Sequence, residues 1–188
     1  ERKWLSSAQA QISRLDNLIK NLVELARTEE TVQDASRTVF SLSDIALACG
    51  DSFQPLAEAA GKSLRTAIAP NLHMRGIQDN LFRLFSILLD NAVKYGAPGG
   101  TITLTLERTE RQARLTVANP GDPIPPEHLA HLFERFYRAD ASRGEKSGFG
   151  LGLAIADTIA REHKGALKAE SDAASTRFIF TMPLKKQA

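Results

Sequence analysis

The stretch "SGFGLGLAIADTIAREHKG" (residues 147–165) places Gly148, Gly150 and Gly152 at the start of an apolar run with helical spacing. Glycine permits positive φ angles and a close approach of other backbone segments. The N-terminus of a helix presents unpaired N–H groups and a partial positive charge. Both features suit an anion, most often a phosphate, but a flexible loop ahead of a helix could carry the same glycines. The neighbouring sequence therefore has to decide between a phosphate site and an ordinary loop.

The composition excludes several classes of protein. The 188 residues include 24 Lys and Arg and 22 Asp and Glu, a balance that provides no basic stripe for nucleic acid. Cys49 is the only cysteine, so no internal disulfide can form, which is typical of a reducing cytoplasm. No apolar run approaches the length of a membrane span, and no signal peptide is visible. Because Glu1 is not a natural start, we expect a fragment, and any attachment to a membrane would lie upstream of it.

Residues 1–31 predict one long amphipathic helix. Apolar residues recur there at steps of three and four, at Leu5, Ala8, Ile12, Leu15, Ile19 and Leu22. A helix of this length needs a partner for its apolar stripe. That partner is either the rest of the same chain or a helical bundle or dimer seam, and we favour the second interpretation.

Residues 38–186 have the pattern of an α+β domain. Apolar and alternating segments predict strands at "TVFSL" (38–42), "KSLRTAIA" (62–69), "TITLTLE" (101–107), "ARLTVAN" (113–119) and "RFIFTMPL" (177–184). In the third of these Ile102, Leu104 and Leu106 alternate as in a half-buried strand, and the last strand is expected to close the sheet. Helices are expected from Ser43, as an N-cap, to about Gly61, and over "IQDNLFRLFSILLDNAVKYG" (77–96). The inward face of the second helix is expected at Leu81, Leu84, Phe85, Leu88, Leu89 and Ala92. This order favours two layers, with the helices on one face of the sheet.

Several common catalytic motifs are absent from the sequence. There is no G-x-x-x-x-G-K-[ST] phosphate loop and no G-x-S-x-G nucleophile elbow. The glycines of residues 148–152 read G-x-G-x-G and follow the polar segment "ADASRGEKS" (139–147), so a dinucleotide-binding interpretation fails on context. The four histidines are scattered, and only His128 and His131 lie close together, so we do not expect a zinc site.

Three other segments carry polar residues in positions that suggest a site. In "LLDNAVKYG" (88–96), Asn91 lies three or four residues before Lys94 and Tyr95, so the three share one helix face. Ordinary polarity at a helix end would give the same pattern. "VANPGDPIP" (117–125) places an asparagine after a strand, and "LFERFYRADASRGEK" (132–146) joins an aromatic and basic patch to a polar stretch fit for a mobile lid.

In their order and spacing these segments resemble the nucleotide boxes of sensor histidine kinases, within the wider superfamily that includes gyrase, Hsp90 and MutL. The similar segments are "LLDNAVKY" (88–95) for the N box, "NPGDPIP" (119–125) for G1, "LFERFYR" (132–138) for the F box and "GFGLGLAI" (148–155) for G2. The resemblance implies a Bergerat-type ATP-binding fold over residues 38–186, a two-layer α/β sandwich of mixed sheet and helices. "RLDNLIKNLVELARTEE" (14–30) resembles the second helix of the family's dimerisation bundle, so residues 1–31 would be an incomplete bundle. Residues 119–143 are most similar to the metal-responsive branch.

The resemblance also implies roles for individual residues, with ATP and Mg²⁺ as cofactors. Asn91 would offer its amide oxygen to Mg²⁺, Lys94 would pair with phosphate, and Arg138 would reach the γ-phosphate. The implied nucleotide-binding residues are Asn91, Lys94, Tyr95, Asn119, Gly121, Ile124, Phe133, Arg138, Gly148, Gly150, Leu151 and Gly152.

The sequence departs from the family pattern at several positions. Asn119 stands where the family usually has an aspartate that accepts from the adenine amino group, and its side-chain oxygen can still accept that bond. Pro123 replaces a second G1 glycine, and "SDAASTRF" (171–178) lacks the late G3 glycines. Ile87 replaces an N-box asparagine, and the glutamate base of the gyrase and MutL branch. Because isoleucine cannot activate water, rapid ATP hydrolysis is disfavoured while transfer to a protein nucleophile stays open.

The resemblance implies a protein histidine kinase that transfers the γ-phosphoryl of ATP to a histidine on a dimerisation helix, for relay to a response regulator. No histidine lies in residues 1–31, so we expect this fragment alone not to phosphorylate itself. The intact receptor would be a homodimer through the N-terminal helix, and this part would be the cytoplasmic domain of a bacterial inner-membrane receptor. Two alternatives remain: a non-catalytic module gated by nucleotide, and an anti-sigma-type serine kinase, which would not need the long helix.

Overall fold

The computed structural model describes residues 37–109, 111–137 and 150–184, together with Ile12, Ile19 and Val23. By its internal contacts the chain divides into two units, Glu1–Asp34 and Ala35–Ala188. In the first unit the three described residues are helical, and their exposed fractions are 68% for Ile12, 54% for Ile19 and 47% for Val23. The remainder of the predicted N-terminal helix lies outside the described residues.

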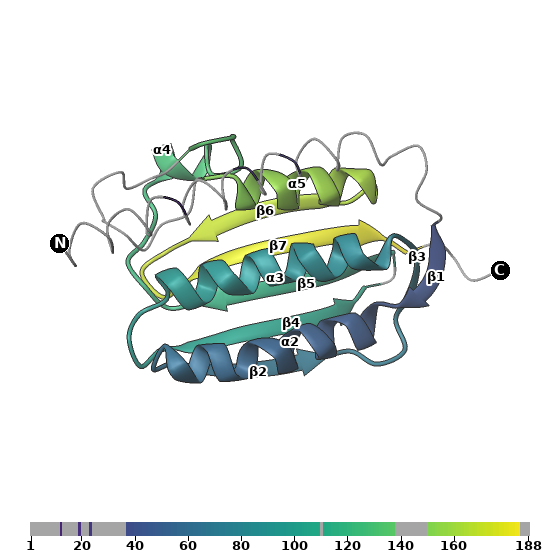
Figure 1. Cartoon of the computed structure of the whole chain (residues 1–188), viewed down its shortest axis with the longest axis horizontal. Coiled ribbons are helices and arrows are strands. Elements are labelled where there is room, and N and C mark those ends of the chain that lie inside the picture. Colours follow the sequence, from purple (N-terminus) through teal and green to yellow (C-terminus); the bar gives the residue numbers. More distant parts are fainter. Residues whose placement is uncertain are drawn as a thin grey trace. The chain divides into compact units, whose positions relative to one another are not determined.

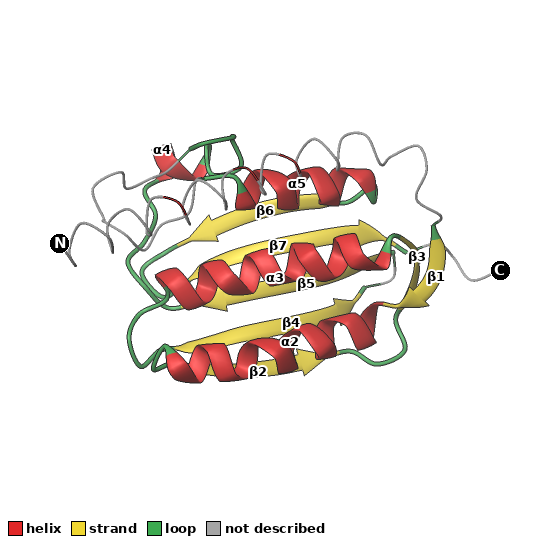
Figure 2. Ribbon diagram, in the orientation of Figure 1, coloured by secondary structure: helices red, strands yellow, loops and turns green. Residues whose placement is uncertain are grey.

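The second unit is built on a five-stranded mixed sheet with helices on one face (Figure 1). The strand order is β2 (Ser63–Ile68), β4 (Thr101–Arg108), β5 (Gln112–Asn119), β7 (Thr176–Pro183) and β6 (Ala166–Ser171). Strands β2 and β4 pair in parallel, and the other pairs are antiparallel. The helices are α2 (Leu42–Ala59), α3 (Gln78–Tyr95), the short α4 (Pro126–Leu129) and α5 (Gly152–Glu162). In Figure 2, α2, α3 and α5 run across the same face of the sheet, which confirms the predicted two-layer architecture.

The core lies between the sheet and helix α3. The predicted inward face of this helix is fully buried at Leu81, Leu84, Phe85, Leu88, Leu89 and Ala92. Alternate residues of the central strands are buried against it, including Ile102, Leu104 and Leu106 of β4. The rings of Phe85 and Phe180 meet with their centroids 6.3 Å apart, which joins α3 to β7. This packing holds α3, the helix that carries Asn91, in place against the sheet.

The structure differs from the predicted elements in three respects: the N-cap of α2, two further strands and the edge of the sheet. Ser43 is not the N-cap of α2, because Ser41 accepts the hydrogen bond from the Asp44 N–H at 3.1 Å. Ser43 is buried instead and donates to the carbonyl oxygen of Ala69 at 2.7 Å. A strand β3 (His73–Gly76) pairs with β1 (Thr38–Ser41), and a strand β6 precedes β7. Strand β7 therefore does not close the sheet; β6 forms that edge.

Helix α5 is fastened at its C-terminal end by a buried histidine. His163 is 5% exposed, its Nδ1 lies 2.8 Å from the Ile159 carbonyl oxygen, and its Nε2 accepts from the Ile77 N–H at 3.1 Å. The ring is therefore held in one neutral tautomer, with its proton on Nδ1. Burial lowers the pKa of His163 because it disfavours the charged imidazolium, and the nearby Arg37 acts in the same direction.

We expect His163→Ala to lower the free energy of unfolding by about 2–4 kcal/mol at pH 8, through a cavity and two lost hydrogen bonds. In the unfolded chain His163 takes up a proton as the pH falls below its ordinary pKa of 6.5, whereas in the folded chain it stays neutral to lower pH. The stabilisation by neutral His163 is complete above that value and is lost as the pH falls through the lowered pKa. Urea unfolding should thus show a gap between wild type and variant that shrinks from pH 8 to pH 5.

The exposed His73 supplies a matched control, because His73→Ala removes a histidine without opening a cavity. A gap for His163→Ala that stays constant or widens toward pH 5 would contradict the neutral, buried state.

Candidate functional site

Asn91 lies in the last turns of α3 with its amide oriented by the helix itself. Its Nδ2 donates to the carbonyl oxygen of Ile87 at 2.9 Å. This bond turns the Oδ1 oxygen outward, where it accepts no hydrogen bond from any residue that the structure describes. A half-buried amide oxygen in this state is a free ligand for a hard cation or for a hydrogen-bond donor.

Lys94 lies one helical turn further along, on the exposed side of α3. Its Nζ is 2.5 Å from Oδ2 of Asp90, in an ion pair between positions four residues apart. The two side chains are 41% and 48% exposed, so the pair contributes about 0–1 kcal/mol. Exchange of the Asp90 carboxylate for a phosphate would therefore cost little.

The C-terminal end of α3 meets the end of β5, which joins the N-box and G1 segments. The Ala97 N–H donates to the Pro120 carbonyl oxygen at 2.7 Å. A β-carbon added at Gly96 would lie 3.3 Å from Cβ of Asn119, so only glycine allows this approach without displacement. One added at Gly121 would lie 3.2 Å from the carbonyl oxygen of Tyr95.

Asn119, at the end of β5, is 5% exposed and its amide has a defined orientation. Its Nδ2 donates to the Pro120 carbonyl oxygen at 3.2 Å. The Oδ1 oxygen accepts from none of the described residues, so it is available to accept a hydrogen bond from a ligand. The side chain thus presents an acceptor oxygen, the property predicted from the sequence for this position.

The glycine turn before α5 faces the middle of α3. A β-carbon added at Gly152 would lie 3.4 Å from Cγ2 of Ile87, the residue whose carbonyl oxygen holds Asn91. Gly150 has φ +70°, and its carbonyl oxygen accepts from the Phe136 N–H at 3.0 Å. Leu151 is 1% exposed and anchors this turn in the core. The F-box end, the G2 turn and the Asn91 face of α3 are therefore adjacent.

The remaining predicted site residues that the structure describes include Ile124, Phe133 and Tyr95. The Ile124 N–H donates to Oγ of Ser171 at 2.9 Å, which ties the G1 loop to the end of β6. Phe133 is half-buried in the segment after α4, and Tyr95 is 58% exposed. Arg138 and Gly148 lie outside the described residues. The segments that hold Asn91, Asn119 and Gly150 thus all contact α3 or its C-terminal end.

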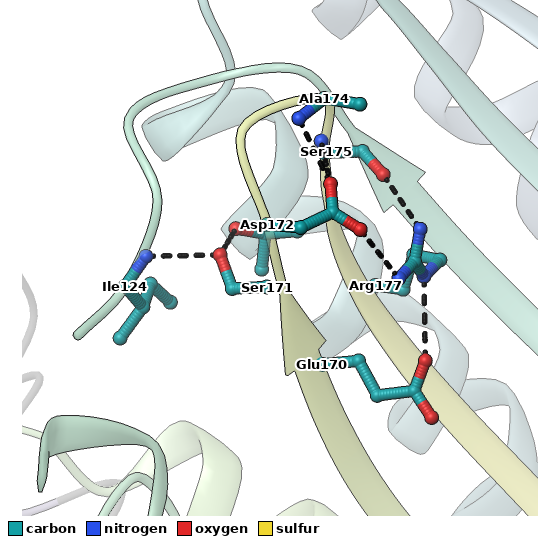
Figure 3. Close-up of polar contacts among 8 residues, drawn as sticks. Ile124, Glu170, Ser171, Asp172, Ala174, Ser175 and Arg177 are labelled. Carbon is teal, nitrogen blue, oxygen red and sulfur yellow. Dashed lines mark hydrogen bonds and ion pairs between the residues drawn. The ribbon is translucent and has the colours of Figure 1, made fainter. Parts of the chain in front are cut away.

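The turn between β6 and β7 replaces the missing G3 glycines with a side-chain network (Figure 3). Oδ1 of Asp172 accepts from the N–H groups of Ala174 at 2.8 Å and Ser175 at 3.0 Å. Its Oδ2 accepts from Arg177 at 2.8 Å, and Arg177 also lies 3.4 Å from Glu170. These backbone N–H bonds, with Arg177, lower the pKa of Asp172. The Asp-x-x-Ser pattern of residues 172–175 is the sequence signal for this network, which the absence of glycine does not reveal.

The site fits a magnesium ion that is bound together with a phosphate ligand. Among the described residues no group of three or more His, Cys, Asp and Glu could hold a metal by itself. Mg²⁺ characteristically takes one or two protein oxygens and completes its shell with water and phosphate oxygens. The outward Oδ1 of Asn91 is an oxygen of that kind.

In the described part of the chain, no helix has the length and apolarity needed to span a membrane.

A comparison with protein families identifies the class to which this site belongs. The family model described as "Histidine kinase-, DNA gyrase B-, and HSP90-like ATPase" matches residues 76–186, more than half of the chain. The chain therefore belongs to the histidine kinase-, DNA gyrase B-, and HSP90-like ATPase family.

Curated relatives narrow the class to sensor histidine kinases. Sensor histidine kinase CusS of Escherichia coli (strain K12) is 36% identical over 180 residues, which are 95% of this chain and 37% of CusS. Sensor histidine kinase RppB of Synechocystis sp. (strain ATCC 27184 / PCC 6803 / Kazusa) is 36% identical over 182 residues, 96% of this chain and 40% of RppB. The chain thus spans well under half the length of these relatives.

Solved structures share the fold. The mycobacterial sensor histidine kinase MprB matches with a TM-score of 0.70 and 25% identity, over 78% of this chain and 97% of MprB. ShkA in complex with AMPPNP gives a TM-score of 0.82 at 22% identity, over 97% of this chain and 38% of ShkA. ThkA in complex with the response regulator protein TrrA gives 0.76 at 22% identity, over 97% of this chain and 51% of ThkA. These findings confirm the predicted fold and the predicted class, the catalytic ATP-binding domain of a sensor histidine kinase.

Proposed function

We propose that this chain binds ATP with Mg²⁺ at the C-terminal half of α3 and transfers the γ-phosphoryl group to a histidine on a dimerisation helix. The observation that carries the proposal is the convergence on α3 of two oriented amides and a glycine turn. Asn91 and Asn119 each present an amide oxygen that accepts from none of the residues the structure describes, and the turn at Gly150, just before helix α5 begins, lies against the same stretch of α3. An amide oxygen for the base, another for the metal and a helix start for the phosphates are what a nucleotide triphosphate requires.

The residues of the site would divide the work between base and phosphates. Asn119 Oδ1 would accept from the exocyclic amino group of adenine, and Lys94 would leave Asp90 for a phosphate oxygen. Asn91 and the phosphates would hold Mg²⁺, which would supply charge neutralisation for the transferred group. Ile87 lies against Gly152 and carries no group that could activate water, which favours transfer to a protein nucleophile over hydrolysis. Arg138 and Gly148 stay candidates for contacts to the phosphates.

The wider assembly is part of the same proposal. Residues 1–31 would be the second helix of a dimerisation bundle and residues 38–186 the catalytic domain, with the homodimer formed through the N-terminal helix. The exposed apolar side chains of Ile12 and Ile19, seven residues apart, support a helix that packs against a partner. The ThkA structure contains a response regulator, which supports a response regulator as partner here. A cytoplasmic position below a membrane receptor, and a place in the metal-responsive branch, also stay predictions.

The test supplies the missing histidine in trans, as a helix hairpin carrying the phosphoacceptor and a matching second helix. With Mg²⁺ and ATP labelled on the γ-phosphate, we expect acid-labile label on the hairpin histidine and none on this chain incubated alone. Asn91→Ala should abolish the transfer. Asn80→Ala, which changes an asparagine near the other end of α3, is the matched control.

Two outcomes would contradict the proposal in different ways. ATP binding without any transfer to the hairpin would favour the alternative, a module that is gated by nucleotide and regulates a partner. Label that resists acid and lies on a serine would favour a serine kinase.

A further inference from the structure

Ser171, at the end of β6, links two segments of the proposed nucleotide site through one hydroxyl group (Figure 3). Its Oγ accepts from the N–H of Ile124, in the G1 loop, at 2.9 Å. The same oxygen lies 2.8 Å from Oγ1 of Thr176 on β7. The hydroxyl therefore joins the G1 loop to strands β6 and β7.

Thr176 brings this link next to Asn119. In the sheet register Ser171 is paired with Thr176, and Thr176 is paired with Asn119. All three side chains point to the helix-covered face, because Phe178 and Val117, two residues away on their strands, are buried there. Adjacent strands lie about 4.8 Å apart, so the three residues form a continuous polar row at the end of an apolar sheet face.

The β6–β7 turn beside this row is closed by side-chain hydrogen bonds. Asp172 closes the turn through its bonds to Ala174 and Ser175, and Arg177 joins Asp172 to Glu170. Thr176 is 6% exposed, so its hydroxyl has few alternatives to Ser171 as a partner. Without the Ser171 hydroxyl, the Ile124 N–H and the Thr176 hydroxyl would each lose the partner that fixes them.

We propose that Ser171 is a positioning residue for recognition of the adenine base, because its hydroxyl sets the G1 loop at Ile124 and the Thr176 side chain beside Asn119. The inference rests on the proposed ATP-binding function and adds a specificity determinant to it. Ser171 acts through Thr176 and Ile124, and not by touching the phosphates. Its effect should therefore fall on the choice of base.

The test compares ATP with GTP, which share the triphosphate tail and differ in the base. We expect Ser171→Ala to weaken binding of Mg-ATP about tenfold, the effect of roughly one lost hydrogen-bonding arrangement, and to leave the weaker binding of Mg-GTP nearly unchanged. The ratio of the two dissociation constants should collapse accordingly. Ser171→Thr, which restores a hydroxyl, should recover the preference. Ser175→Ala removes a hydroxyl from the same turn that, within the described part of the chain, accepts from Arg177, and it should leave the preference for ATP intact.

The outcomes separate this inference from the proposed function. If wild type binds no ATP, the proposed function itself fails. If wild type prefers ATP and Ser171→Ala keeps that preference, or loses affinity for both nucleotides equally, Ser171 is not a determinant of base recognition. If Ser171→Ala does not fold, Ser171→Thr and Ser171→Val are compared instead, because threonine and valine have similar shapes. The preference for ATP over GTP should then be retained in Ser171→Thr and lost in Ser171→Val.

Discussion

Replacement of Gly150 with alanine should weaken ATP binding by at least about 30-fold, equivalent to about 2 kcal/mol. Gly150 has φ +70°, a conformation that costs a residue with a β-carbon about 1–2 kcal/mol. The added β-carbon would also lie 2.6 Å from the carbonyl oxygen of Tyr137 and 2.8 Å from the carbonyl carbon of Phe136. Both are backbone atoms that cannot rotate away, so the F-box end and the G2 turn must separate.

Gly99→Ala is the matched control for this substitution. Gly99 has nearly the same φ, +69°, but an added β-carbon there would meet nothing within 4 Å. The control therefore carries the conformational cost without the collision. Calorimetric titration with Mg-ATP, together with the melting temperature of each variant, measures both effects. Equal ATP affinities for the two variants would contradict a role for the close F-box and G2 contact in the site.

The helix-covered core of the domain could be predicted from the sequence because its apolar residues recur with a clear helical or strand period. In α3 the six predicted inward residues are the six that are buried, and the β4 strand shows the same agreement. These segments are long, and burial on a single face leaves a regular pattern in the sequence. Box order then predicted which segments form the nucleotide site, and the structure brings the described ones to the same helix.

Short and irregular elements escaped prediction for physical reasons. Strand β3 has four residues, including an exposed histidine and arginine, and its pairing with β1 depends on tertiary contact. Strand β6 begins at a helix end and lies at the sheet edge, where alternation is weak because one side has no neighbouring strand. Ser41 and Ser43 are both capable caps, and only the burial of Ser43 against Ala69 decides between them.

Side-chain orientation at the site was also beyond the sequence. The family resemblance predicts that the amides of Asn91 and Asn119 face a ligand, but it does not predict which atom of each amide faces outward. Bonds to the carbonyl oxygens of Ile87 and Pro120 determine that both present an oxygen. The ion pair of Lys94 with Asp90 and the Asp172 turn similarly arise from local geometry.

Asn91→Ala should reduce the affinity for Mg-ATP about 100-fold, because about 3 kcal/mol is a reasonable effect for removing a ligand to a charged group. The substitution removes the outward oxygen and the bond to Ile87 while preserving helix propensity, so α3 should stay folded. In wild type, removal of Mg²⁺ with EDTA should weaken ATP binding strongly. In the variant, the same treatment should have little further effect, because the proposed protein ligand to the metal is already gone.

Calorimetric titration of Mg-ATP into wild type and Asn91→Ala, with Asn80→Ala alongside, is therefore the most direct measurement of whether α3 carries the nucleotide. If α3 carries the nucleotide, wild type and Asn80→Ala should show saturable binding, and Asn91→Ala should lose about two orders of magnitude in affinity. Equal affinity of all three proteins, or no binding heat with wild type, would contradict it.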